Sequence, residues 1–305
     1  MRIVFMGTPD FAVASLDALV RAGCNIVGVI TAPDKPAGRG QKLSESAVKK
    51  YAADHGLPVL QPVRLKDPAF LGELAALRAD LQVVVAFRML PEAVWNMPPK
   101  GTINLHASLL PQYRGAAPIN WAIINGESES GVTTFFLKHE IDTGDIIFSE
   151  KVAIGNSDTA GDLHDRLMEV GASLLVRTVK AIESGDYTEV PQEEVTGGAE
   201  LKHAPKIFKE DCAINFNQDA DRVFNHIRGL SPYPTAFTHF QDKTLKIFNA
   251  VPEKGEPGIS PGGILSDQKT YLKFACRNGF ISVTDIQLEG KKRMNIQEFL
   301  RGVRL

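Results

Sequence analysis

Over roughly its first 180 residues, the chain alternates short apolar runs with amphipathic helical segments. Strands that alternate with helices pair in parallel and are joined by right-handed crossovers. This alternation therefore predicts an α/β fold with a Rossmann-like, mostly parallel sheet. The runs that predict strands are Ile3 to Met6, Asn25 to Thr31, Leu81 to Ala86 and Thr102 to Leu105.

The segments between and after these strands predict the rest of this half. Thr8 and Pro9 indicate a helix start in which a capping side chain precedes a proline at the first helical position. Gly7 is not followed by the second and third glycines of a dinucleotide fingerprint, so we expect no nicotinamide cofactor. The other predicted elements are helices at Ser44 to His55, Pro118 to Asn125 and Asp158 to Glu183, and a strand pair at Gly131 to Leu137 and Asp145 to Val152.

The pattern changes after residue 184. Residues 185–205 hold Gly197-Gly198, two prolines and few large apolar side chains, which is typical of a linker. Beyond it, short strands at close spacing with one helix, Asp219 to Arg228, predict a small β-barrel, of which the five-stranded OB-like kind is one candidate. We therefore expect domains at 1–184 and 206–305. The barrel strands are predicted at Thr235 to Phe240, Thr244 to Val251, Tyr271 to Ala275 and Gly279 to Ile286.

Charge is nearly balanced over the 305 residues, with 34 basic and 36 acidic side chains. This balance excludes a generally polybasic protein, but it hides an asymmetry. From Lys206 onward there are 15 basic and 11 acidic side chains, against 19 and 25 before it. A polyanionic partner of the second half and two ordinary surfaces are both compatible with these numbers.

The cysteines, the N-terminus and the apolar runs of the sequence bear on the cellular location that we expect. The three cysteines, Cys24, Cys212 and Cys276, are far apart and form no metal-type pair, which indicates idle thiols in a reducing compartment. The N-terminus lacks a signal-peptide pattern, and no apolar run approaches the roughly 20 residues of a spanning helix. We expect a cytoplasmic protein that does not bind membranes.

Polar side chains gather where a predicted strand ends. In open α/β sheets the site lies beyond the carboxyl ends of the strands. Asn104 and His106 are two residues apart there, so both project from one face. An amide donor beside an imidazole suits acyl transfer, because one group holds oxyanion charge while the other manages a proton. The alternative for an isolated Asn-x-His is a strand end whose polar groups are merely hydrogen-bonded.

Asp142 lies in a turn where Gly144 is expected to take a positive φ angle. Such an aspartate is usually a turn former, but if the turn returns to the neighbouring strand, Asp142 could orient and charge-stabilise His106. Serine hydrolysis by Ser108 is disfavoured because no nucleophile elbow surrounds it, so Ser108 is expected to cap or pin its loop. The seven histidines are scattered without ligand spacing, so we expect no metal site.

The run from Asn104 to Pro118, the turn Asp142 to Asp145 and the opening Phe5 to Phe11 together resemble the folate-dependent formyltransferases. The resemblance covers nearly the whole chain. It implies that Asn104, His106 and Asp142 are catalytic, that 10-formyltetrahydrofolate is a consumed co-substrate, and that no cofactor is tightly bound. The folate pocket that it implies is formed by Phe87, Arg88, Leu90, Ser108, Leu109, Leu110, Pro111 and Asp142. Arg88 departs from the family, which has a glycine there in a longer loop, so contacts near this position are the least transferable.

The segment Pro33 to Leu43 bears on the acceptor of the formyl group. A Gly- and Pro-rich loop that carries Lys35, Arg39 and Lys42 suits phosphate contacts, although an ordinary solvated loop would have the same composition. The segment resembles the loop with which some members of the family reach the acceptor stem of methionyl initiator tRNA. We expect that acceptor and a monomer. The alternatives are an amino sugar nucleotide as acceptor, or a non-catalytic RNA-binding protein with this fold.

Overall fold

The computed structural model describes residues 1–37, 42–198 and 200–302. The chain divides into two compact units, each assembled from three segments. Unit 1 contains Met1–Arg114, Gly131–Val152 and Asp165–Lys202, and unit 2 contains Gly115–Ser130, Ala153–His164 and His203–Leu305. No helix among the described residues is long and apolar enough to cross a membrane.

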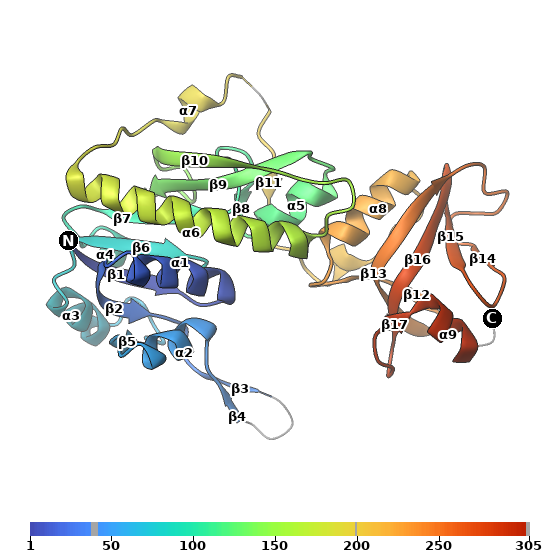
Figure 1. The fold of residues 1–305 in the computed structure, drawn as a ribbon, viewed down its shortest axis with the longest axis horizontal. Coiled ribbons are helices and arrows are strands. Elements are labelled where there is room, and N and C mark those ends of the chain that lie inside the picture. The colour runs from blue at the N-terminus through green and yellow to red at the C-terminus, as the bar shows by residue number, and fades with distance from the viewer. Residues whose placement is uncertain (38–41, 199, 303–305) are drawn as a thin grey trace. The chain divides into compact units, whose positions relative to one another are not determined.

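Unit 1 is built on a seven-stranded mixed sheet in the order β10-β9-β7-β6-β1-β2-β5 (Figure 1). Five of its strands are parallel neighbours, and β9 joins them by antiparallel pairing with β7. The parallel part confirms what the alternating pattern predicted. The strands are β1 (Arg2–Gly7), β2 (Asn25–Ile30), β5 (Val59–Leu60), β6 (Leu81–Val85), β7 (Thr102–His106), β9 (Glu129–Phe136) and β10 (Ile146–Ala153).

Helices cover this sheet. The long helix α6 packs on β7 and β9, since Gly171 lies against Leu105 and the hydroxyls of Thr178 and Thr134 are 2.9 Å apart. The predicted cap of the first helix was wrong: Pro9 itself is the N-cap residue, without a side-chain cap, and the Thr8 carbonyl accepts a hydrogen bond from Val48. The helices are α1 (Asp10–Arg21), α2 (Ala47–Asp54), α3 (Pro68–Ala76), α4 (Glu92–Trp95), α6 (Ala160–Ser184) and α7 (Gln192–Val195).

Four short strands lie outside the large sheets. β3 (Lys35–Ala37) pairs with β4 (Lys42–Ser44) as an antiparallel hairpin, and β8 (Arg114–Gly115) pairs with β11 (His203–Ala204). The helix predicted from Ser44 begins later, at Ala47, because the Ser46 side chain caps α2 by accepting a hydrogen bond from the Lys49 N–H. Ser44 itself belongs to β4.

Unit 2 contains an antiparallel six-stranded sheet in the order β12-β13-β16-β15-β14, with β17 on β16. Its core includes the stacked rings of Phe216 and Phe274, with centroids 4.9 Å apart. The strands are β12 (Ala236–Phe240), β13 (Lys243–Lys254), β14 (Ile264–Ser266), β15 (Leu272–Cys276), β16 (Gly279–Leu288) and β17 (Met294–Asn295); the helices are α5 (Pro118–Ile124), the 3-10 helix η1 (Glu210–Cys212), α8 (Ala220–Gly229) and α9 (Ile296–Gly302).

His226 on α8 is expected to make unit 2 less stable in acid. Burial lowers the pKa of this imidazole, and its Nε2 is buried without a hydrogen-bond partner among the described residues. In the unfolded chain the His226 imidazole binds a proton near pH 6.5, but in the folded chain it does so only at lower pH. The stability that is present above pH 6.5 is therefore lost as the pH falls through that value, by at most about 1.4 kcal/mol per pH unit. We expect thermal denaturation between pH 7.5 and 5 to show a smaller drop for His226→Gln. An identical drop would show that His226 does not contribute.

Candidate active site

β7 lies inside the sheet of unit 1, between β6 and β9, and places two of the predicted residues at its carboxyl end. Asn104 and His106 alternate with Leu105 along this strand, so they project from the same face. Asn104 is half-buried and His106 is 7% exposed. The strand therefore presents an amide and an imidazole together, largely shielded from water.

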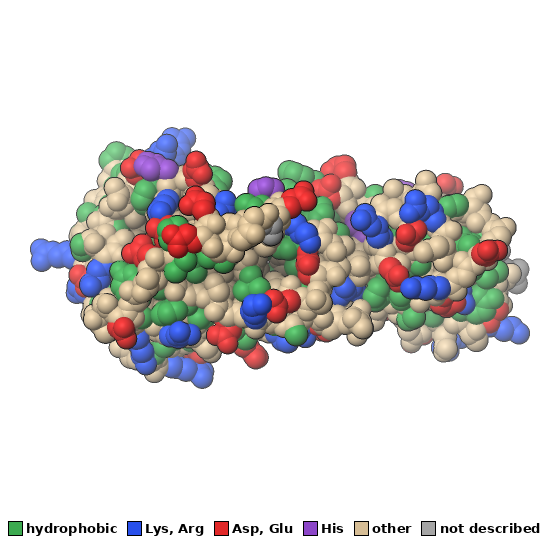
Figure 2. All heavy atoms as spheres, turned by 90° about the horizontal axis from the view of Figure 1, so that it is seen from above, with side chains coloured by type: hydrophobic (Ala, Val, Ile, Leu, Met, Phe, Trp, Pro, Cys, Tyr) green, Lys and Arg blue, Asp and Glu red, His purple; other side chains and the backbone are tan. Residues whose placement is uncertain are grey.

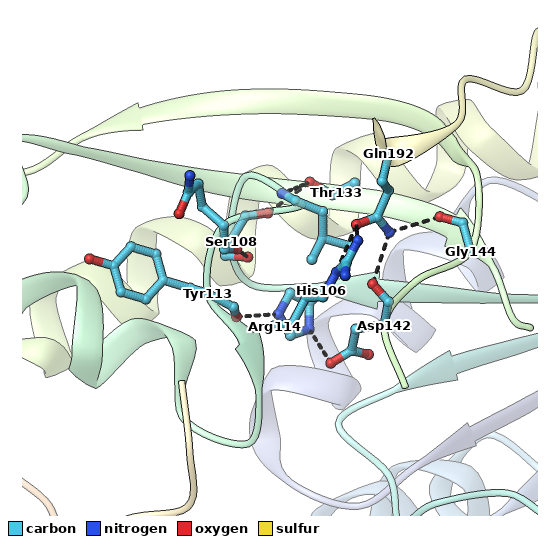
Figure 3. Close-up of polar contacts among 10 residues, drawn as sticks. His106, Ser108, Tyr113, Arg114, Thr133, Asp142, Gly144 and Gln192 are labelled. Carbon is cyan, nitrogen blue, oxygen red and sulfur yellow. Dashed lines mark hydrogen bonds and ion pairs between the residues drawn. The ribbon is translucent and has the colours of Figure 1, made fainter. Parts of the chain in front are cut away.

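The contacts of His106 define where it can exchange a proton (Figure 3). Its Nε2 lies 3.0 Å from the carbonyl oxygen of Tyr113, which can only accept, so Nε2 carries the hydrogen and donates it. Nδ1 faces the Asp142 carboxylate, 3.9 Å from Oδ2. In the neutral ring, Nδ1 therefore holds the free lone pair, and this is the atom that can accept a proton beside a carboxylate.

Asp142 reaches His106 because the loop before it folds back. β9 runs antiparallel to β7 and ends with Phe136 opposite Ile103, and the Leu137 N–H then donates to the Thr102 carbonyl. The residues that follow double back toward His106. Asp142 is buried and has a φ angle of 56°, a left-handed conformation that is uncommon outside glycine.

The prediction that Gly144 supplies the positive φ of this turn was wrong, since Asp142 does so. Gly144 is required for a different reason: a Cβ there would lie 1.5 Å from the carbonyl oxygen of Phe136. The turn thus combines a strained aspartate with a close backbone approach. Strain of this kind is often found at functional sites.

Two residues that the sequence did not single out hold the turn (Figure 3). Gln192, on the four-residue helix α7, is 2% exposed and its Nε2 donates to the carbonyl oxygens of Asp142 and Gly144, both at 2.8 Å. Arg114 donates to Oε1 of the same Gln192 through Nε at 3.0 Å and an Nη atom at 2.6 Å. Gln192 lies in the segment predicted as a linker, and no local motif marks it.

Ser108 organises the loop after β7. It is fully buried, and its hydroxyl donates to the Gln112 carbonyl at 2.6 Å, which pins the loop as expected. Thr133 of β9 holds the same loop, because its hydroxyl donates to the Ser108 carbonyl and accepts from the Leu110 N–H. Leu110 and Pro111 are buried and Leu109 is half-buried.

The loop after β6 carries the other residues predicted to bind folate. Phe87 and Leu90 pack against the apolar cluster under β1, β2 and β6. The Arg88 guanidinium donates to the carbonyls of Pro62 and Val63, and burial lowers the pKa of this group. Arg88 therefore ties its loop to the chain after β5, while the residue itself stays exposed.

Two of the three residues predicted to bind tRNA, Lys35 and Lys42, lie on the short strands β3 and β4. Lys35 is exposed on β3, in a hairpin whose base is fixed by Asp34, which accepts from Gln61 Nε2 at 2.8 Å and pairs with Lys49. The backbone of Lys42 lies in β4, and Arg39 lies outside the described residues. The hairpin projects from the part of unit 1 that holds α2 and β5 (Figure 1).

Within residues 1–37, 42–198 and 200–302, no group of three or more His, Cys, Asp or Glu side chains could hold a metal ion. The three cysteines are free, with Cys212 and Cys276 buried. Burial raises the pKa of the Cys276 thiol to about 11, so this thiol stays protonated and unreactive near neutral pH.

Comparison with known proteins matches two family models to the chain: formyl transferase over residues 1–179, and formyl transferase, C-terminal domain, over residues 206–304. The chain is 54% identical to a methionyl-tRNA formyltransferase of Bacteroides fragilis, with 100% of this chain and 96% of that protein covered. It is 57% identical to a protein of the same name from Parabacteroides distasonis, with 99% and 95% covered.

Solved structures share the fold at lower identity. The sugar 3N-formyl transferase WlaRD, solved in the presence of dTDP and 5-N-formyl-THF, superposes with a TM-score of 0.68 at 22% identity, with 96% of this chain and 99% of that chain covered. HypX from Aquifex aeolicus in complex with tetrahydrofolic acid gives a TM-score of 0.67 at 20% identity, with 99% of this chain and 48% of that chain covered. These likenesses concern the fold alone.

Proposed function

We propose the following reaction for this chain, which belongs to the formyl transferase family and within it to the methionyl-tRNA formyltransferases. The chain transfers the formyl group of 10-formyltetrahydrofolate to the α-amino group of methionyl initiator tRNA. The observation that carries the proposal is the arrangement around β7: His106 Nδ1 faces the Asp142 carboxylate at 3.9 Å, with the Asn104 amide on the same strand face.

The chemistry of the acceptor suits this arrangement. An α-amino group has a reference pKa of about 7.7 to 8.0, so a useful neutral fraction exists near neutral pH. The amine nitrogen attacks the formyl carbon, and a tetrahedral intermediate forms. The Asn104 amide and the protonated or donating His106 stabilise its oxyanion. Asp142 balances the charge of His106 and passes on the amine proton; as the bond from carbon to the folate nitrogen breaks, that nitrogen gains a proton.

Folate is proposed to bind beside this trio as a consumed co-substrate, with no tightly bound cofactor. Phe87 and Leu90 would offer apolar contacts, and Arg88 would act by holding their loop. The loop that Ser108 pins, with Leu109, Leu110 and Pro111, would form the other wall, and Asp142 would close the pocket.

The acceptor tRNA is proposed to meet two parts of the chain. Lys35, Arg39 and Lys42 of the hairpin segment would contact the acceptor stem, while residues 206–305, joined by a linker at 185–205, would form an OB-like β-barrel domain that binds tRNA. The basic excess from Lys206 onward supports this role. Figure 2 shows cations and carboxylates interspersed over one face, so individual contacts would matter more there than a single charged patch. The enzyme is proposed to act as a monomer in the cytoplasm.

The test incubates the protein with 10-formyltetrahydrofolate and either charged initiator tRNA or an amino sugar nucleotide. We expect transfer to the tRNA. We expect Arg39→Ala to lower kcat/KM for tRNA by about 5- to 150-fold, which corresponds to about 1–3 kcal/mol, while KM for folate is unchanged. Arg21→Ala, which removes an exposed cation of α1, is the matched control. Transfer to the sugar alone would overturn the proposal, and tRNA binding without any transfer would indicate a non-catalytic RNA-binding protein.

A further inference from the structure

A closed ring of contacts surrounds the pair His106 and Asp142. His106 Nε2 donates to the Tyr113 carbonyl, the next residue is Arg114, Arg114 binds Gln192, and Gln192 binds the Asp142 carbonyl. The ring closes through space, between the Asp142 carboxylate and His106 Nδ1. The separation of the His106 and Asp142 side chains therefore depends on Gln192, which binds the backbone of the turn and not the imidazole or the carboxylate.

We propose that Gln192, oriented by Arg114, is a positioning residue for formyl transfer that fixes the Asp142 turn and thereby the distance from its carboxylate to His106. The proposal rests on the proposed function, because formyl transfer is the reaction whose geometry it would set. It assigns a specific role to the helix α7, which the sequence placed in a linker.

The hydrogen bonds of Gln192 explain why an amide is needed. The two N–H groups of the Gln192 amide donate to the carbonyls of Asp142 and Gly144, and its oxygen accepts two hydrogen bonds from Arg114. All donors and acceptors of this buried side chain are therefore satisfied. Glutamate has the same shape but cannot donate to two carbonyls, and its charge would face two carbonyl oxygens. Alanine would leave two buried carbonyls and part of a guanidinium without these partners, which is costly.

The segment that carries Gln192 has other attachments, so removing this side chain should act locally. Val190 and Ile146 exchange two backbone hydrogen bonds of 2.9 Å. Gln112 donates to the Glu200 carbonyl and accepts from the Lys202 N–H. The contacts of Gln112 hold the same segment without touching the Asp142 turn, and they provide a matched control.

The activity test compares wild type, Gln192→Ala, Gln192→Glu, Arg114→Lys and Gln112→Ala in steady-state formyl transfer. A misplacement near 1 Å at reacting groups can cost about 10²-fold in rate, so we expect kcat to fall by about 10²-fold in both Gln192 variants, with the KM for tRNA nearly unchanged. Arg114→Lys should fall by less, since one donor remains. The pH profile of kcat should also change, because the carboxylate beside His106 is displaced. Gln112→Ala should keep both kcat and the profile.

A second measurement does not depend on the reaction. Long-range nitrogen–proton NMR spectra of the His106 ring report which nitrogen carries a proton. We expect Gln192→Ala to change this spectrum in the same direction as Asp142→Asn, and Gln112→Ala to leave it as in wild type, with thermal melts confirming that all variants are folded. An unchanged His106 spectrum in Gln192→Ala would overturn the inference. An inactive wild type would overturn only the proposed function, since the spectra would still decide the role of Gln192.

Discussion

Alanine at Asn104, at His106 or at Asp142 is expected to lower the rate of formyl transfer by at least about 10²- to 10³-fold, the usual cost of losing one group that stabilises an oxyanion. Asn104 and His106 share one face of β7, and Asp142 faces His106 from the returning loop, so each variant leaves the other two side chains in place. Single-turnover transfer to charged initiator tRNA measures the effect, and filter binding measures tRNA affinity, which should change little.

Thr143→Ala is the matched control for this set, because Thr143 adjoins Asp142 but its hydroxyl donates to the Glu140 carbonyl instead of facing His106. Asp142→Asn adds a further comparison, since it removes the charge and keeps the shape. If the charge beside His106 is what matters, Asp142→Asn should be nearly as slow as Asp142→Ala. Any residue whose alanine variant stays within a few-fold of wild type has no part in the chemistry.

The elements of unit 1 that the sequence predicted best are those in which local pattern and long-range packing agree. β1, β2, β6 and β7 are apolar runs that stay buried in the sheet, and each of their ends differs from the predicted bound by at most one residue. Short elements such as β5 and α4 were not predicted, because two to four residues carry too little periodicity to identify. They form where the surrounding fold places them.

The active-site residues were predictable only where their contacts depend on local sequence. Asn104 and His106 could be paired from their spacing on one strand, because strand geometry is local. The approach of Asp142 required a loop that doubles back along an antiparallel strand, and the resemblance to known formyltransferases, rather than any spacing, supplied the expectation. Gln192 had neither kind of signal, since its contacts are 48 and 50 residues away at Gly144 and Asp142. Only a folded chain reveals such a contact.

Gly144→Ala is expected to disrupt both the turn and the reaction. The added Cβ would lie 1.5 Å from the Phe136 carbonyl oxygen, which is backbone at the end of β9 and cannot rotate away. To remove this clash, the chain between Asp142 and Asp145 must move. The Gly144 carbonyl would then lose its hydrogen bond from Gln192. Overpacking usually costs about 1–3 kcal/mol of stability, and the displaced carboxylate should lower kcat by about 10²-fold.

Gly72→Ala separates this effect from a general intolerance of alanine. Gly72 lies within the exposed part of α3, and a Cβ there meets nothing within 4 Å, so this variant should gain about 0.5–1 kcal/mol from helix propensity and keep full activity. Denaturant unfolding and steady-state transfer, measured on both variants, make the comparison. Wild-type stability and rate in Gly144→Ala would mean that the turn can relax without moving Asp142. The close approach of Gly144 to β9 would then have no part in placing the carboxylate beside His106.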